Sequence, residues 1–206
     1  MIERVQHLVN YGWPNIDGYT VRTSGLVNAQ HRELGLDTRV VTGPYAAFAR
    51  AGDPDFVTAA WNDGQKTVGR TTSWERPGLG FAPVSRRSMI EDLTDAARQF
   101  EAELIHVHHP HYLAAPARQV ADRLGIPMVY EVRCFNGDYD LDRHHPYFSR
   151  IRGPLFNRNE YRQCRAADAV VTISDGLADR IRAEAGVEDV AVVRNSVDTG
   201  IFAPKA

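Results

Sequence analysis

The segment "ELIHVHHPHYLAAPARQVADRLGIPMVYEVR", residues 103–133, contains the structural unit that recurs along the chain. Two short apolar runs, "ELIHVH" and "PMVYEVR", enclose a stretch of helical length from about Tyr112 to Leu124. Runs of this size and composition predict strands. A helix that joins two strands of one sheet makes a crossover, so the two strands are expected to be parallel.

The rest of the sequence alternates in the same way. Strands are predicted at residues 4–10, 37–43, 167–174 and 190–195, and helices at residues 20–34, 88–101, 177–185 and in a segment that ends near Ala167. Gly35 supplies a stop for the first helix. This order predicts an α/β fold with a Rossmann-like, doubly wound and mainly parallel sheet.

Two segments depart from the alternation. Residues 56–74 carry Asn62, Asp63 and Gly64 between strand-like runs, which predicts a hairpin or strand pair inserted at the sheet edge. A long polar loop is expected up to Pro146. No internal repeat or low-complexity segment is present.

The composition is that of an ordinary globular protein, with 43% hydrophobic and 24% charged residues among 206. A net charge of -2 predicts no general attraction to nucleic acid. Cys134 and Cys164 are too few for a disulfide framework, which favours a reducing compartment. The first residues lack an apolar run long enough for a signal peptide or a membrane span. We therefore expect a cytoplasmic protein, at most peripheral at the inner face of a membrane.

Four histidines, His106, His108, His109 and His111, fall at the end of the strand at 103–108 and in the loop that follows. Ligands of doubly wound sheets bind outside the carboxyl ends of the strands. Three interpretations remain open: a metal site, hydrogen bonding to a polar organic ligand, or one buried histidine bonded to backbone with the others in solvent. The spacing matches no specific metal motif, so we expect no bound metal.

Other loops reach the same edge. Gly18 precedes the first helix and allows a phosphate to approach the backbone, although the surrounding loop is neither G-x-G-x-x-G nor a Walker loop. Glu131 and Arg133 end one strand, and Ser174 and Asn195 end two others. These groups suit a hydroxyl-rich substrate that carries a phosphate. Glu131 and Arg133 are equally compatible with a simple ion pair.

Four segments in order resemble one known family. They are "DGYTVRTSGLVNAQHRELGLDTRVVT", "AELIHVHHPHYLAAPARQVADRLGIPMVYEVRCF", "CRAADAVVTISDGLADRI" and "VAVVRNSVDTGIF". Together they resemble the N-terminal domain of retaining GT-B glycosyltransferases of family 4. The resemblance implies that residues 1–198 form the acceptor-binding domain. Residues 199–206 would then begin the hinge to a C-terminal donor domain that this sequence lacks.

The resemblance also implies an activity: transfer of a sugar from a nucleotide-sugar to a glycan or lipid-linked acceptor, in polysaccharide or glycoconjugate synthesis. It implies no metal or other cofactor, and no activity of this chain without the donor domain. The leaving diphosphate of the donor is expected to help deprotonate the acceptor. A non-catalytic sugar- or nucleotide-binding module and a metal-dependent hydrolase built on the histidines are the alternatives.

Residue roles follow by position in the resemblance. Gly18 and Tyr19 are expected to bind the donor, and the catalytic group is expected to be Arg133, Glu131 and His108. Acceptor binding is assigned to Arg22, His109, His111, Ser174 and Asn195. Arg133 stands where the family often has a histidine. A guanidinium stays protonated and cannot serve as a base, but it can stabilise phosphate or acceptor charge.

The segment "YFSRIRGPLFNRNEYRQCR", residues 147–165, mixes arginines with apolar side chains. It is compatible with a helix that docks on an anionic membrane, but the pattern favours a solvated helix whose apolar side faces the core. Gly153 and Pro154 are expected to interrupt a continuous helix here.

Overall fold

The computed structural model describes residues 1–10, 17–42, 69–70, 86–138 and 146–196. Most of the expected insertion at 56–74, the loop before Pro146 and the expected hinge at 199–206 lie outside these residues.

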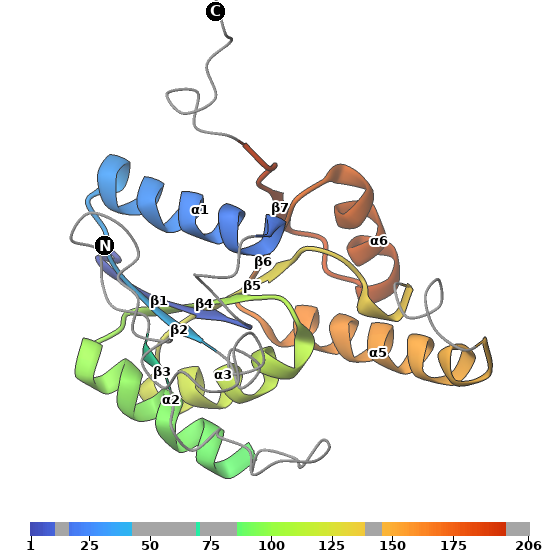
Figure 1. Cartoon of the computed structure of the whole chain (residues 1–206), viewed down its shortest axis with the longest axis horizontal. Helices are drawn as coiled ribbons and strands as arrows, with labels where there is room; N and C mark the ends of the chain where they lie inside the picture. The colour runs from blue at the N-terminus through green and yellow to red at the C-terminus, as the bar shows by residue number, and fades with distance from the viewer. Residues whose placement is uncertain (11–16, 43–68, 71–85, 139–145, 197–206) are drawn as a thin grey trace, which may run out of the picture.

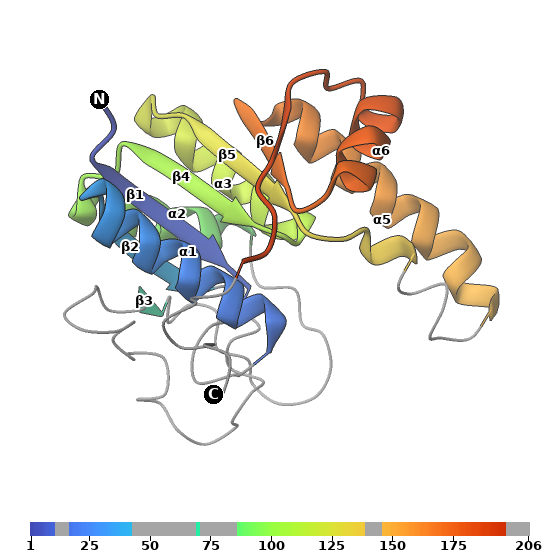
Figure 2. The same cartoon turned by 90° about the horizontal axis from the view of Figure 1, so that it is seen from above.

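Within these residues the fold is a seven-stranded, wholly parallel sheet in the order β3-β2-β1-β4-β5-β6-β7 (Figures 1 and 2). The strands are β1 (Arg4–Val9), β2 (Asp37–Thr42), β3 (Gly69–Arg70), β4 (Leu104–His108), β5 (Met128–Val132), β6 (Ala169–Thr172) and β7 (Val190–Val192). The helices are α1 (Gly18–Leu34), α2 (Arg86–Phe100), α3 (His111–Leu124), α5 (Pro146–Ala166) and α6 (Asp175–Ala185). The predicted Rossmann-like α/β fold is confirmed.

The sheet separates two layers of helices. Figure 1 shows α1 on one face of the sheet and α2 and α3 on the other. Side chains alternate along a strand, so successive residues face opposite layers. In β4, Ile105 and Val107 belong to the large apolar core, in which residues of α2 and α3 also take part, while β5 adds Tyr130 to the same core. Val9 and Val40 pack with Val27 of α1 in a smaller cluster.

Local sequence sets the helix ends. The side chain of Asp17 caps α1 by accepting a hydrogen bond from Thr20 N at 2.8 Å. Gly35 follows α1 with φ of 64°, a left-handed conformation that glycine adopts without strain. The predicted stop of the first helix is therefore confirmed.

The expected interruption of the helix at Gly153 and Pro154 is wrong, because α5 runs through both residues. A proline removes one backbone donor from a helix, and tertiary contacts offset that loss here. Gly137 packs directly against this turn, and its N–H donates to Asn157 Oδ1 at 3.1 Å. Asn157 Nδ2 in turn donates to Asp138 Oδ1 at 2.8 Å.

This contact yields a test of packing. A Cβ atom at Gly137 would lie 2.1 Å from the backbone oxygen of Gly153, so Gly137→Ala forces the two segments apart. We expect the free energy of unfolding to fall by about 1 to 3 kcal/mol in urea titrations. Gly25→Ala on α1 is the control, since a Cβ there has no described atom within 4 Å. It should raise stability by about 0.5 to 1 kcal/mol. Equal stability of the two variants would refute this account of α5.

Candidate functional site

A buried carboxylate stands at the carboxyl end of β5. Glu131 has no exposed surface, and its Oε1 accepts hydrogen bonds from Arg22 Nη2 at 2.5 Å and Arg22 Nε at 2.8 Å. Its Oε2 accepts from Arg133 Nη2 at 2.9 Å and lies 2.5 Å from His108 Nδ1. The simple pairing of Glu131 with Arg133 is confirmed, but it belongs to a larger group. We call Glu131, Arg22, Arg133 and His108 the Glu131 network.

The Glu131 network carries a net positive charge. Burial by itself would raise the pKa of the Glu131 carboxyl, but His108 and the Arg133 guanidinium outweigh it and hold this pKa well below its usual range. Burial also lowers the pKa of His108 to about 3, so the imidazole is neutral at neutral pH. His108 Nδ1 lies 2.5 Å from Glu131 Oε2 and 2.7 Å from Arg133 Nη2, so it donates to the carboxylate in one neutral tautomer and accepts from the guanidinium in the other. Two guanidinium groups against one carboxylate give a formal charge of +1.

A row of side chains extends from the Glu131 network toward α1. His7 Nδ1 lies 2.9 Å from His108 Nε2, and His7 Nε2 lies 2.8 Å from Gln30 Oε1. Burial lowers the pKa of His7 to about 3. Sequence reasoning missed His7 and Gln30, and no spacing could have found them. His7 meets the histidines of β4 only because β1 and β4 pair with His7 opposite His106.

The Glu131 network also ties separate elements together. Arg22 Nη1 donates to Asn195 Oδ1 at 3.0 Å, just after β7, and Arg133 Nη1 donates to the backbone oxygen of Tyr19 at 2.9 Å. The Arg133 guanidinium lies 4.4 Å from the centre of the Tyr19 ring. The Tyr19 hydroxyl accepts from Asn10 N at 2.9 Å and lies 3.0 Å from the backbone oxygen of His109. The first turn of α1 is thereby fixed to the ends of β1, β4, β5 and β7.

A second buried carboxylate lies on the opposite face of the sheet. Glu160 of α5 is fully buried and accepts from the hydroxyl of Tyr130. Its Oε1 lies 2.9 Å from His109 Nε2 and 3.0 Å from His111 Nδ1. Burial raises the pKa of this carboxyl, but the hydrogen bonds from His111 and Tyr130 and the nearby His109 bring it below its usual value. Glu160 was missed, although it is the only acidic residue in α5.

The four histidines are therefore divided between two carboxylates. The interpretation with one buried histidine bonded to backbone is wrong, because His106, His108 and His109 are all buried and their rings face side chains. His111 keeps 15% of its side chain exposed. Alternation along β4 sends His106 and His108 to the α1 face, while the loop after the strand turns His109 and His111 toward α5.

Two expected site residues stand apart from both carboxylates. Ser174 caps α6 by accepting from Leu177 N at 3.4 Å, and none of its described contacts reaches either group. Gly18 begins α1, and no described atom lies within 4 Å of a Cβ built on it. Packing against the described part of the protein therefore does not require a glycine at this position.

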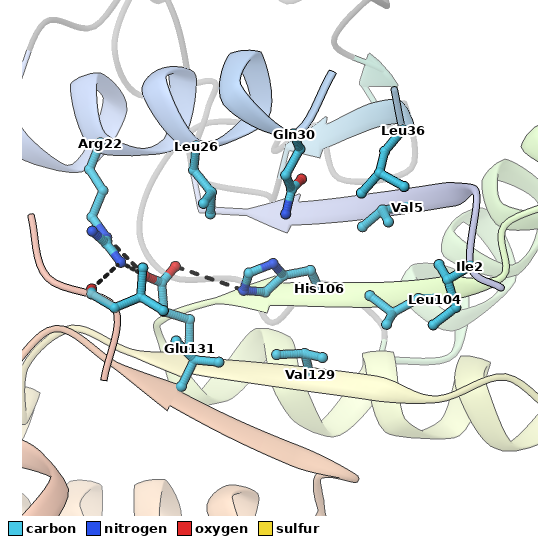
Figure 3. A pocket seen from close by; sticks show the side chains of 12 residues that line it. Ile2, Val5, Arg22, Leu26, Gln30, Leu36, Leu104, His106, Val129 and Glu131 are labelled. Carbon is cyan, nitrogen blue, oxygen red and sulfur yellow. Dashed lines mark hydrogen bonds and ion pairs between the residues drawn. The ribbon is translucent and has the colours of Figure 1, made fainter. Parts of the chain in front are cut away.

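A cavity of about 360 Å³ adjoins the Glu131 network on the α1 face (Figure 3). Arg22, Gln30, His106 and Glu131 supply its polar side chains. The remaining walls are apolar and come from α1 and the sheet, with Leu26, Leu104 and Val129 among them. Figure 3 shows the Glu131 carboxylate between Arg22 and His106, whereas Gln30 lies farther along α1 and contacts His7.

The sequence profile described as "Glycosyl transferase 4-like domain" matches residues 17–196, which include both carboxylate groups and most of the sheet. The chain belongs to the glycosyl transferase 4-like family. No curated protein matches the sequence of this glycosyl transferase 4-like domain.

Solved structures share its fold at low sequence identity. Sucrose-phosphate synthase from Thermosynechococcus elongatus superposes with a TM-score of 0.74 at 14% identity, over 98% of this chain and 50% of that one. A UGT transferase from Siraitia grosvenorii in complex with UDP gives 0.57 at 12% identity, over 94% and 51%. UDP-GlcNAc 2-epimerase from Neisseria meningitidis, bound to UDP-GlcNAc, gives 0.55 at 11% identity, over 92% and 45%. The chain spans about half the length of these proteins, and its fold is one Rossmann-like half of a GT-B fold.

Within the ranges that the structure describes, no helix has the length and apolar character needed to cross a membrane.

The buried histidines make stability depend on pH. The pKa of His7 and of His108 is lowered from 6.5 to about 3, so below 6.5 the unfolded chain binds protons that the folded chain does not. We expect the free energy of unfolding to fall as the pH decreases from 6.5 toward 3, by about 1.4 kcal/mol per pH unit for each of the two imidazoles. Urea unfolding at a series of pH values measures this slope.

Two variants test whether the buried histidines cause this pH dependence of stability. His7→Gln should reduce the slope by about one proton, because it removes one of the buried imidazoles with a lowered pKa. His31→Gln, at an exposed histidine of α1, is measured beside it as the matched variant. A slope that is flat, or that His7→Gln leaves as it is, would contradict the assignment.

Proposed function

We propose that this chain is the acceptor-binding half of a retaining glycosyltransferase. The whole protein would transfer a sugar from a nucleotide-sugar to a glycan or lipid-linked acceptor, in polysaccharide or glycoconjugate synthesis. The observation that carries the proposal is the positive Glu131 network at the carboxyl end of the sheet, in a domain of the glycosyl transferase 4-like family. Parallel sheets of this type bind ligands at that edge.

The charge of the network fits a phosphate-bearing substrate. Arg22 and Arg133 share one carboxylate, so their positive charge is only half neutralised. A guanidinium presents a planar pair of donors that matches phosphate oxygens. A nucleoside diphosphate is the class of ligand that this excess charge favours, and UDP or a UDP-sugar is named with two of the similar structures.

Exposure separates residues that can touch a substrate from those that position them. Glu131 and His108 have no exposed side-chain surface, so in this proposal they hold Arg133 in place. Arg133 and Arg22 keep 8% and 11% of their side chains exposed. Of the two histidines that contact the Glu160 carboxylate, His111 has the larger exposed surface. Its Nδ1 faces Glu160, which leaves Nε2 as the nitrogen that can accept a hydrogen bond from an acceptor hydroxyl.

The other expected site residues also have roles in the proposed transfer reaction. No atom of the described residues lies within 4 Å of a Cβ built on Gly18, whose backbone would approach the donor diphosphate in this proposal, with Tyr19 fixing the first turn of α1. Asn195 joins Arg22 to the segment after β7, which is proposed to lead into the hinge. His109, held by Glu160, shapes the acceptor loop. Transfer would need no metal, because the leaving diphosphate takes the acceptor proton and arginines stabilise its charge.

The first experiment compares the full-length gene product with this chain in sugar transfer. Both are assayed with a panel of nucleotide-sugars and a chelator, against glycan and lipid-linked acceptors. Turnover by the longer protein alone, unaffected by the chelator, is the expected result. Saturable binding of nucleotide-sugar without turnover by either protein would instead favour a non-catalytic binding module.

Arg133 has its own test in the full-length protein. Arg133→Lys keeps the charge but cannot bond Glu131 and the Tyr19 carbonyl from one planar group. We expect kcat/KM to fall by about a hundredfold, mostly through kcat, as for the loss of one stabilising donor in a transition state. Arg123→Lys, exposed near the end of α3, should leave the rate unchanged. Equal rates for the two variants would remove Arg133 from the mechanism.

We also propose that α5 contacts the inner face of an anionic membrane, where a lipid-linked acceptor would lie. Its exposed side carries Leu155, Arg158, Arg162 and Arg165, at helical spacing, and no acidic residue, since Glu160 faces inward. Leu155 as a residue is 52% exposed. A basic helix face with an apolar residue suits anionic headgroups.

Vesicle binding tests this contact. Arg158→Gln with Arg162→Gln should weaken binding to vesicles containing phosphatidylserine by roughly thirtyfold, since each arginine near such a surface contributes about 1 kcal/mol. Binding to neutral phosphatidylcholine vesicles should be weak for every variant. A control pair with the same change in charge is Arg32→Gln with Arg98→Gln, exposed on α1 and α2. Equal losses for the two pairs would show that net charge, and not α5, governs binding.

A further inference from the structure

Three histidine rings lie close together on the face of the sheet that α1 covers. His7 of β1 and His106 and His108 of β4 are all buried, and one ring nitrogen from each lies within 4.8 Å of the others. The pairing of β1 with β4 sets His7 directly beside His106, and His108 follows two residues later on the same face. The proposed function uses only His108 of the three, and uses it through Glu131.

His108 Nδ1 and His7 Nε2, the outer nitrogens of this group, point away from the other imidazoles. Their partners are of the kind that metal-bound histidines usually have. In the tautomer with a proton on Nδ1, His108 donates to the carboxylate of Glu131 at 2.5 Å, and Arg133 Nη2 lies 2.7 Å from the same nitrogen. His7 Nε2 lies 2.8 Å from the carbonyl oxygen of Gln30 and donates to it in this arrangement. In metal centres, such bonds to a carboxylate or a carbonyl fix the tautomer and direct the other ring nitrogen toward the ion.

When both outer nitrogens carry the proton, the inner nitrogens His7 Nδ1 and His108 Nε2 carry lone pairs that face each other. His7 Nδ1 and His108 Nε2 are 2.9 Å apart, and in this tautomer neither has a hydrogen to share, whereas in the tautomer in which His108 Nδ1 accepts from Arg133, His108 Nε2 donates to His7 Nδ1. A shared proton, or reversal of the Gln30 amide, would satisfy this pair alone. Neither supplies a partner for His106 Nε2. That atom is buried, has no hydrogen bond within the described residues, and lies 3.9 Å from Glu131 Oε2.

We propose that His7 Nδ1, His106 Nε2 and His108 Nε2 bind one divalent transition-metal ion. A single cation between the three nitrogens satisfies them all. Neutral imidazoles favour Zn²⁺, Co²⁺, Ni²⁺ or Cu²⁺ over Mg²⁺ and Ca²⁺, which take oxygen ligands. The ion takes no part in the proposed transfer reaction, so its contribution is to the stability of the fold, and turnover does not require it. This site departs from the sequence-based expectation of no metal, because His7 enters only through strand pairing.

Geometry and charge set limits on this site. The rings of His106 and His108 are stacked with centres 4.2 Å apart, so closure on an ion requires the His106 ring to rotate. Zinc–nitrogen bonds of about 2.0 to 2.1 Å place two tetrahedral ligands about 3.3 Å apart. Arg22 and Arg133 oppose a dication, and Glu131 offsets only one of them. We therefore expect weaker binding than in sites with thiolate ligands.

Metal titration of the purified 206-residue chain tests the proposal. After chelator treatment, Zn²⁺ is titrated by calorimetry and Co²⁺ by its visible absorption, with one ion per chain as the expected result. His106→Phe removes one ligand and leaves the His7–His108 pair in place. It should weaken binding at least about tenfold. The exposed His31→Gln variant should bind as the natural sequence does.

A second variant covers the case in which His106→Phe fails to fold. Gln30→Glu gives His7 Nε2 an obligate acceptor and adds a negative charge, so it should tighten Zn²⁺ binding. Circular dichroism confirms that each variant is folded. The proposal is overturned if the folded natural chain shows no saturable binding of Zn²⁺ or Co²⁺. It is also overturned if folded His106→Phe binds with unchanged affinity, or if Gln30→Glu fails to tighten binding.

Discussion

The ionised carboxylate of Glu131, buried at the end of β5, is the constraint on which the rest of the site depends. An unpaired charge in a protein interior is very unfavourable, so the surrounding elements must supply positive partners. Arg22 arrives from α1 and Arg133 from the loop after β5, and His108 completes the group from β4. Breaking one member of a buried pair typically costs about 3 to 5 kcal/mol, which fixes these elements relative to one another.

The same constraint explains why a structural network can also serve a ligand. One carboxylate cannot neutralise two guanidinium groups, and both retain a small exposed surface at the sheet edge. Arg22 also bonds the chain after β7, and Arg133 bonds the backbone at the start of α1. The positive charge is therefore held in place before any substrate binds, which is the condition for effective electrostatic stabilisation.

Alternation across the sheet divides the polar chemistry of the chain into two parts. Residues 106 and 108 face α1 and the Glu131 carboxylate, whereas Tyr130 of β5 faces the other layer and the Glu160 carboxylate. The loop after β4 joins the two, because Glu160 receives both His109 and His111. A histidine run that looks continuous in sequence thus serves two carboxylates on opposite faces.

The local pattern of the sequence determined the order of strands and helices, the parallel sheet and the glycine that ends α1, because hydrophobic periodicity and glycine conformation act over a few residues. It also indicated the sheet edge where Glu131, Arg133 and His108 gather. It failed at Gly153 and Pro154, where α5 continues and packs against Gly137. His7, Gln30 and Glu160 entered only through the tertiary structure. Strand register and helix packing bring together residues that are far apart in sequence, and no local spacing encodes those meetings.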